Sequence, residues 1–182
     1  YDVKSAERVG LEPLPGILDA LARVGSRGVI FSGTFFEPGE GGQAPDAQVT
    51  PYAASKARVW AALQAGCATR GLALSKCVFS NPIGPGENED RLLPLFLKAA
   101  LAREPFSLGA PLAVGDQLPV QALADAFVRL VGEMEQGRSM IARPSGWHGN
   151  LRDWLAKVNA EFIVGAMWLP AVEVNVGAGR AT

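Results

Sequence analysis

Residues 50–56 read Thr-Pro-Tyr-Ala-Ala-Ser-Lys, and they open an Ala-rich stretch. Alanine has the highest helix propensity, and Gly71 stands where glycine commonly ends a helix. The pattern therefore predicts a helix over residues 52–70, in which Lys56 shares a face with Tyr52, four residues earlier. A phenol has a pKa of about 10, and a neighbouring cation favours its ionised form. The pair is therefore suited to moving a proton on or off a carbinol oxygen.

Two short apolar segments flank this helix in the sequence. Residues 28–32, Gly-Val-Ile-Phe-Ser, are typical of a strand in a buried parallel sheet, and they run on to Thr34. Residues 72–79 predict the next strand. Strand, helix and strand in this order predict a parallel, right-handed βαβ unit. The Gly-, Pro- and Asp-rich residues 37–51 are expected to form a loop between the first strand and the helix.

The rest of the chain predicts shorter elements. Residues 1–24 carry an apolar helical face that Pro13 and Pro15 interrupt, so we expect a broken helix there. Asp90 is a candidate N-cap for a further helix. The periodicity predicts helices at 90–103, 121–135 and 150–162, and short strands at 106–108, 118–120 and 139–142.

Composition limits the classes of function. The chain has 182 residues and a formal net charge of −1, which fits one domain with or without a small appendage, and argues against a nucleic-acid or membrane-surface partner. Two cysteines, Cys67 and Cys77, and one histidine, His148, make neither a disulfide framework nor a metal site. No stretch reaches the roughly 20 apolar residues that span a bilayer, and we expect a cytoplasmic protein.

Four segments together resemble a known family, the extended short-chain dehydrogenase/reductases of the NAD-dependent epimerase/dehydratase group. Residues 29–34, Val-Ile-Phe-Ser-Gly-Thr, resemble the strand whose end bears the catalytic Ser or Thr, and residues 50–56 resemble the start of the catalytic helix. Residues 81–86, Asn-Pro-Ile-Gly-Pro-Gly, resemble the turn after the next strand. Residues 92–108 resemble the helix and strand that begin the substrate lobe. The resemblance covers about residues 16–131.

The resemblance implies three catalytic residues. Tyr52 would be the general acid/base, and Lys56 would lower its pKa and hydrogen-bond the nicotinamide ribose. Thr34 would hydrogen-bond the substrate oxygen. The plainer alternatives are a capping aromatic with a solvated lysine neighbour for the pair, and a capping or turn residue for Thr34.

The same resemblance implies contacts around the reacting atoms. Asn81 would contact substrate, Pro82 would flank the nicotinamide, and Ser32 would contact the cofactor. As alternatives, Asn81 could be an ordinary turn residue, since Asn-Pro starts turns, and Ser32 could simply satisfy backbone at a strand end.

The fold class that we expect is α/β, a partial Rossmann-like doubly wound parallel sheet with a small C-terminal substrate lobe. Residues 1–83 and 117–136 would form the C-terminal part of the NAD(P)-binding domain, and residues 84–116 and 137–182 the lobe. Ligand would lie at the carboxyl ends of the strands that end near Ser32 and Ser80. The resemblance implies NAD or NADP as cofactor, without deciding between them, and a homodimer formed through two long helices.

The chain also departs from the family pattern. No Gly-x-x-Gly-x-x-Gly turn follows a strand anywhere in the sequence, and the chain opens at Tyr1 without a methionine, so we expect a part of a longer protein. Gly115 and Gln121 stand where nucleotide-sugar members carry an arginine and an acid, which weakens the case for a sugar-diphosphate substrate. Residues 37–40, Glu-Pro-Gly-Glu, replace the usual Tyr-Gly.

The predicted function is NAD(P)-dependent redox chemistry on a hydroxyl or ketone of a small substrate, with sugar-like molecules among the candidates. Epimerase, dehydratase and reductase chemistry all use this set of residues and stay open. Two alternatives come from other classes: a truncated, non-catalytic remnant, and a protein that senses dinucleotide or acts as a scaffold without turnover.

Overall fold

The computed structural model describes residues 8–42, 48–164 and 174–176. The chain divides into two compact units, the first made of residues 1–80 and 120–145 and the second of residues 81–119 and 146–182. Parts of the predicted broken helix (residues 1–7) and of the predicted loop (residues 43–47) lie outside the described residues.

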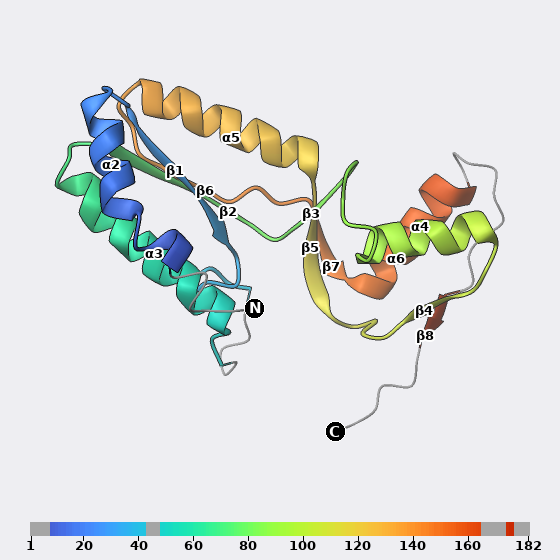
Figure 1. Cartoon of the computed structure of the whole chain (residues 1–182). Coiled ribbons are helices and arrows are strands. Elements are labelled where there is room, and N and C mark those ends of the chain that lie inside the picture. Colours follow the sequence, from blue (N-terminus) through green and yellow to red (C-terminus); the bar gives the residue numbers. More distant parts are fainter. Residues whose placement is uncertain (1–7, 43–47, 165–173, 177–182) are drawn as a thin grey trace. The chain divides into compact units, whose positions relative to one another are not determined.

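A parallel sheet forms the centre of the first unit. Strand β1 (Gly28–Thr34) pairs with β2 (Ala73–Phe79) along its whole length, and β2 pairs with β6 (Ile141–Ala142), all in parallel. The strand order is β1-β2-β6. Helices α2 (Leu14–Arg23) and α3 (Pro51–Ala68) lie on one face of this sheet, and α5 (Val120–Glu135) lies on the other, as Figure 1 shows. The predicted parallel α/β sheet is therefore present.

Helix α3 is the crossover between β1 and β2, and its first residues follow from the sequence. The Thr50 hydroxyl accepts a hydrogen bond of 3.2 Å from the Ala53 amide, and Pro51 occupies the first turn, where its missing N–H costs nothing. The buried face of α3 packs with α2 and the sheet through an apolar cluster. Its buried members are Leu18, Leu63, Cys67 and Leu72.

The opposite face of the sheet is covered by α5. The Phe127 ring meets the Phe79 ring edge-on, with 6.4 Å between their centroids, and Leu130 and Met134 are buried. Both faces of β1 and β2 are thus covered, which explains why these strands lack the alternating polar pattern of a half-exposed sheet.

The second unit has its own sheet and core. Its sheet has the order β3-β5-β7, with β3 (Asn81–Ile83) parallel and β7 (Trp147–Asn150) antiparallel to β5 (Val114–Pro119). The unit also contains α4 (Leu92–Ala102), β4 (Phe106–Leu108) paired with β8 (Val174–Val176), α6 (Leu151–Val158) and a π-helix (Asn159–Val164). The buried members of its core are Phe96, Ala100, Leu108, Trp154, Leu155 and Val158.

Several element boundaries differ from the predicted ones. Helix α4 begins at Leu92, with Arg91 rather than Asp90 at the N-cap and no side-chain cap. Strand β5 begins at Val114 rather than at residue 118. The predicted helix 150–162 starts with Asn150 as its cap, because the Asn150 side chain accepts from the Asp153 amide at 2.8 Å, and it changes to π-helical geometry after Val158.

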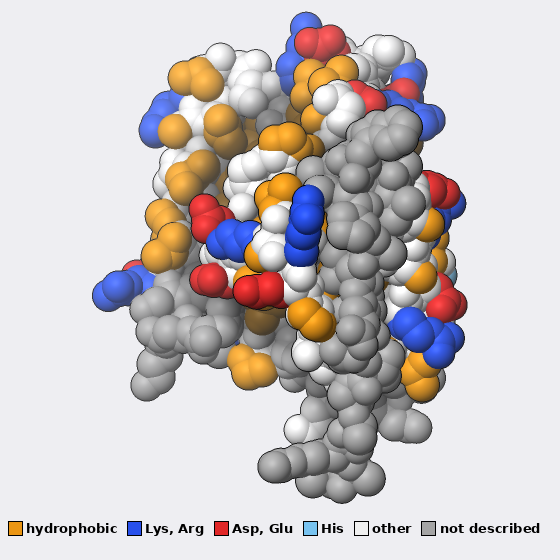
Figure 2. Space-filling view, turned by 90° about the vertical axis from the view of Figure 1, so that its right-hand side faces the viewer, with side chains coloured by type: hydrophobic (Ala, Val, Ile, Leu, Met, Phe, Trp, Pro, Cys, Tyr) orange, Lys and Arg blue, Asp and Glu red, His pale blue; other side chains and the backbone are white. Residues whose placement is uncertain are grey.

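On the face that Figure 2 presents, acidic and basic side chains are interspersed among apolar ones. No helix in the described part of the chain is both long and apolar enough to cross a bilayer.

Gly28 provides a test of the β1–β2 packing. A Cβ at this position would lie 2.2 Å from the Ala73 carbonyl oxygen, which is backbone and cannot move aside. We expect Gly28→Ala to lower the free energy of unfolding by about 1–3 kcal/mol, in the range of overpacked cores. Urea denaturation measures this change.

Gly16 is the matched control, because a Cβ there has no neighbour within 4 Å and the residue is exposed in α2. Gly16→Ala should leave stability unchanged or raise it by up to about 1 kcal/mol. Equal effects of the two substitutions would contradict the β1–β2 geometry.

Candidate active site

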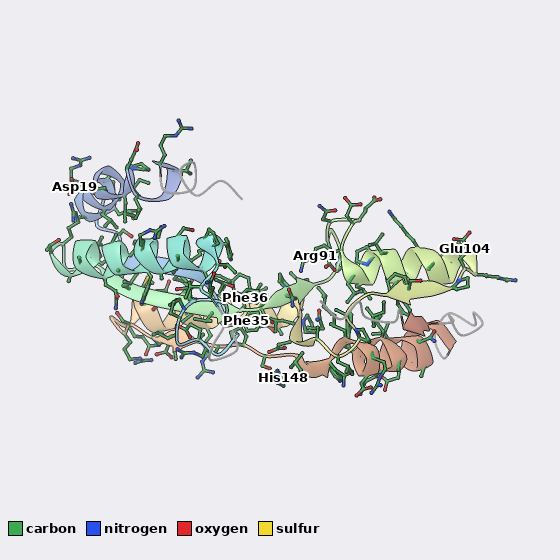
Figure 3. The ribbon with its side chains drawn as sticks, turned by 90° about the horizontal axis from the view of Figure 1, so that it is seen from below. Asp19, Phe35, Phe36, Arg91, Glu104 and His148 are labelled. Atoms are coloured by element: carbon green, nitrogen blue, oxygen red, sulfur yellow. The ribbon has the colours of Figure 1, made fainter. Side chains whose placement is uncertain are left out.

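Strand β1 ends at Thr34, which is 6% exposed. A turn follows, closed by a 3.0 Å hydrogen bond from the Glu37 amide to the Thr34 carbonyl. The Phe36 amide donates to the Thr34 hydroxyl oxygen at 3.4 Å, within the Phe35–Phe36 segment that Figure 3 labels. This bond uses a lone pair of the hydroxyl oxygen, so the O–H proton remains available as a donor.

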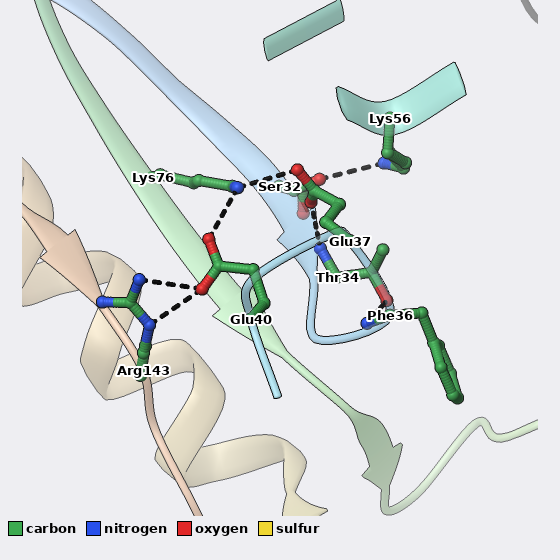
Figure 4. A network of polar contacts seen from close by, with 8 residues as sticks. All are labelled: Ser32, Thr34, Phe36, Glu37, Glu40, Lys56, Lys76 and Arg143. Atoms are coloured by element: carbon green, nitrogen blue, oxygen red, sulfur yellow. Dashed lines mark hydrogen bonds and ion pairs between the residues drawn. The ribbon is translucent and has the colours of Figure 1, made fainter. Parts of the chain in front are cut away.

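The first turns of α3 bring Tyr52 and Lys56 to the end of β1. The Lys56 ammonium donates a 2.9 Å hydrogen bond to the Ser32 carbonyl, as Figure 4 shows. The same nitrogen lies 6.0 Å from the centroid of the Tyr52 ring and 5.2 Å from that of Phe31. Tyr52 is 36% exposed, so its ring is reachable from solvent. Lys56 thus connects the strand that bears Thr34 with the helix that bears Tyr52.

The position of Lys56 affects its charge. Burial lowers the pKa of Lys56 below its ordinary value, because desolvation disfavours the ammonium form. The negative charge of Glu37 acts in the opposite direction and limits this shift. Burial is the larger of these two effects, so the pKa of Lys56 stays below its ordinary value.

A network of four charged side chains lies next to Thr34 (Figure 4), with Glu37 and Lys76 buried and Arg143 exposed at its outer end. Lys76, in the middle of β2, donates to Glu37 at 2.7 Å and to Glu40 at 3.0 Å. Glu40 also accepts from Arg143, with the shortest contact at 2.8 Å. The other carboxylate oxygen of Glu37 accepts from the Thr34 amide at 2.7 Å.

These four residues were not predicted as site residues. Residues 37–40 were noted only as a departure from the family pattern, and Lys76 is the one charged residue of a mostly apolar strand. A lysine in a strand covered on both faces needs a buried partner, so its presence was a usable signal. The partners themselves lie 39 and 36 residues away in sequence.

Asn81 and Pro82 belong to the second unit, on β3. Arg91 donates to the Asn81 side-chain oxygen at 3.4 Å and forms an ion pair of 2.9 Å with Glu87. Asn81, Glu87 and Arg91 line a pocket of about 210 Å³. Its other lining residues are Ile83, Leu92, Leu93, Gln117 and Leu151.

The second unit also holds a larger, apolar cavity of about 490 Å³. Trp147 and Trp154 line it, together with Leu93, Leu97 and Val158. Trp154 is also part of the core, so it serves as both core and cavity wall. His148 is an exposed residue of β7 (Figure 3).

The carboxyl end of β1 is the candidate ligand site of the first unit. Lys56 presents an ammonium at the carboxyl end of a parallel strand, where ligands of open α/β sheets bind, and Tyr52 lies one helical turn before it on α3. The positive-φ glycines that follow β1, Gly39 and Gly41, lie in the loop before α3 and do not open a helix after a strand. Among the described residues, no group of three or more His, Cys, Asp or Glu side chains could hold a metal ion.

Comparisons with known proteins agree with this architecture. The UDP-glucose 4-epimerase from Brucella ovis, solved in complex with NAD, has a TM-score of 0.72 at 21% identity, over 96% of this chain and 60% of that chain. The UDP-glucose 4-epimerase from Thermus thermophilus, also solved in complex with NAD, has a TM-score of 0.67 at 24% identity, over 93% and 57%. The UDP-N-acetylglucosamine 4-epimerase from Methanobrevibacter ruminantium has a TM-score of 0.66 at 19% identity, over 93% and 56%. These likenesses confirm the predicted Rossmann-like fold.

The chain spans a little over half the length of these solved proteins. No curated protein sequence matches it. A sequence profile of the NAD dependent epimerase/dehydratase family matches residues 16–142. This match confirms the resemblance inferred from the four segments, and the chain belongs to the NAD-dependent epimerase/dehydratase family.

Proposed function

We propose that this chain carries the proton-transfer site of an NAD-dependent epimerase or dehydratase, which acts on a hydroxyl or ketone of a small substrate. The observation that carries the proposal is the position of Lys56. Its ammonium binds the Ser32 carbonyl near the end of β1 and also lies 6.0 Å from the Tyr52 ring centroid. One cation thus joins the two elements that bear the candidate catalytic groups.

Each of the three residues has a distinct role in this proposal. Tyr52 takes the proton from a carbinol oxygen or returns it, and the positive charge of Lys56 favours the phenolate form that accepts it. The Thr34 hydroxyl donates a hydrogen bond to the same substrate oxygen. Its orientation is supported by the Phe36 amide, which occupies one lone pair.

The cofactor that we propose is NAD, which supplies the hydride acceptor and donor when bound. Tyr52 and Lys56 would hold the nicotinamide ribose, and Ser32 would contact the cofactor. A cofactor contact by Pro82 remains a prediction from the sequence. Two of the solved neighbours are complexes with NAD, which supports NAD over NADP. The sequence has no Gly-x-x-Gly-x-x-Gly turn after a strand, so the fit covers the nicotinamide end and not the pyrophosphate.

A substrate contact by Asn81 remains a prediction from the sequence. The neighbours described above are named as UDP-sugar enzymes, and the pocket of about 210 Å³ beside Asn81 has room for a small polar group. Gly115 and Gln121 remove two groups that nucleotide-sugar members usually carry, so a sugar nucleotide is one candidate among small hydroxyl compounds. A homodimer and a cytoplasmic location remain predictions from the sequence.

Two alternatives are kept because the pyrophosphate turn is missing from this sequence. As a non-catalytic remnant, the chain would bind no dinucleotide. As a sensing or scaffold protein, it would bind dinucleotide and would not turn over substrate.

Titration calorimetry with NAD⁺ and with NADPH, followed by turnover assays with UDP-glucose and dTDP-glucose, tests the proposal. We expect binding of NAD⁺ and a turnover that Tyr52→Phe lowers by roughly 10²–10⁴-fold, the usual contribution of a general acid or base. The melting temperature should change little, because phenylalanine keeps the aromatic ring of the side chain.

Tyr1→Phe, the same change at the other tyrosine, is the control and should retain full turnover. Absence of NAD⁺ and NADPH binding would favour the remnant. Binding without turnover would favour the sensing protein, and full activity of Tyr52→Phe would refute the role of Tyr52.

A further inference from the structure

We propose that Glu37 is a positioning residue of this site, which binds the Thr34 amide with one carboxylate oxygen and the Lys76 ammonium with the other. It thereby holds the Thr34 hydroxyl at a fixed place beyond the end of β1. The functional consequence rests on the proposed role of Thr34, whereas the positioning itself can be tested without turnover.

The Glu37 carboxylate is buried and makes two short contacts. Its side chain is almost fully buried, at 3% exposure for the residue, and both of its contacts are 2.7 Å long. Hydrogen bonds to an ionised acceptor are shorter and stronger than neutral ones. Together with the bond from the Glu37 amide to the Thr34 carbonyl, the carboxylate closes the turn that carries Thr34 from two sides.

Lys76 is the cation that compensates the buried charge of Glu37. Lys76 is 2% exposed and is held between Glu37 and Glu40, with its nitrogen 5.1 Å from the centroid of the Trp60 ring. Arg143 neutralises Glu40, so two carboxylates and two cations balance. Without a partner, a buried charge costs several kcal/mol, so the buried Glu37 and Lys76 depend on each other. The network therefore ties the loop after β1 to β2 and to the residue that follows β6.

Gly33 is the third observation. A Cβ at this position would lie 2.6 Å from the Lys76 Cε and 3.0 Å from the Glu37 carboxylate oxygen. The residue directly before Thr34 thus leaves the space through which Lys76 and Glu37 meet. A larger residue at position 33 would displace one of these two side chains.

The negative charge of Glu37 also acts on Lys56. Lys56 faces Tyr52 on its own helix, Phe31 and the Ser32 carbonyl on β1, and the carboxylate of Glu37 in the loop. Glu37 raises the pKa of Lys56 against the effect of burial, which supports a role in the site beyond holding the loop.

Two double variants separate positioning from general stability. Glu37→Gln/Lys76→Met and Glu37→Leu/Lys76→Met both remove the buried ion pair, so their free energies of unfolding should be similar. Only the glutamine keeps a carbonyl oxygen that can accept from the Thr34 amide. We expect the Thr34 amide to exchange with solvent roughly tenfold faster in the leucine variant, while the amides within β1 exchange alike. Equal Thr34 exchange in the two variants would overturn the proposal.

The unmodified chain provides a second measurement in case the leucine variant does not fold. A through-hydrogen-bond NMR coupling between the Thr34 amide nitrogen and the Glu37 carboxyl carbon is expected. Its absence, in a spectrum that detects couplings across the β1–β2 ladder, would overturn the proposal. Neither measurement depends on cofactor or substrate, so a failure of the proposed function is recognised separately, by the absence of dinucleotide binding.

If the chain turns over substrate, the two double variants should also differ in kinetics. The leucine variant should have a kcat roughly 10- to 100-fold below that of the glutamine variant, with a similar KM, because a displaced donor weakens the reacting geometry more than binding. Equal kcat values would show that Thr34 is placed without Glu37.

Discussion

The hydrogen bond from the Lys56 ammonium to the Ser32 carbonyl is the interaction on which the site depends. It is a bond between a helix and a strand that are neighbours in the βαβ unit, and it fixes the first turns of α3 against the last residues of β1. In the proposed site, the phenol of Tyr52 and the hydroxyl of Thr34 come from separate elements and would need such a connection to act on one oxygen. The capping of α3 by Thr50 supports it, because the cap sets where the first helical turn begins.

A second constraint is the buried positive charge of Lys76. Lys76 occupies a position in β2 where both faces of the sheet are covered, and it brings a positive charge into an apolar layer. The carboxylates of Glu37 and Glu40 compensate it, and Arg143 pairs with Glu40, so the loop after β1 is held by ion pairs as well as by backbone turns. Such networks rarely raise stability above that of an apolar core, and their best-attested use is to specify one arrangement. Here the specified arrangement is the segment that carries Thr34.

Much of this structure could be predicted from local sequence signals. The alanines and Gly71 predict α3, the apolar run 28–32 predicts β1, and the spacing of Tyr52 and Lys56 places both on one helix face. The network could not be predicted in the same way, because Glu37, Lys76 and Arg143 meet only after β1, β2 and β6 have paired. The pairing of β6 depends on two residues, too short a segment for a periodic pattern.

Titration of Lys56 tests directly whether its ammonium is buried against the end of β1. The Cε signal of a specifically assigned Lys56 can be followed by NMR as the pH is raised. We expect a midpoint below the ordinary lysine value of 10.5, because burial against β1 disfavours the ammonium form. In Glu37→Gln the midpoint should decrease further, because the negative charge that raises the pKa of Lys56 is removed. A midpoint at or above 10.5 that does not respond to Glu37→Gln would place Lys56 in solvent and contradict the site.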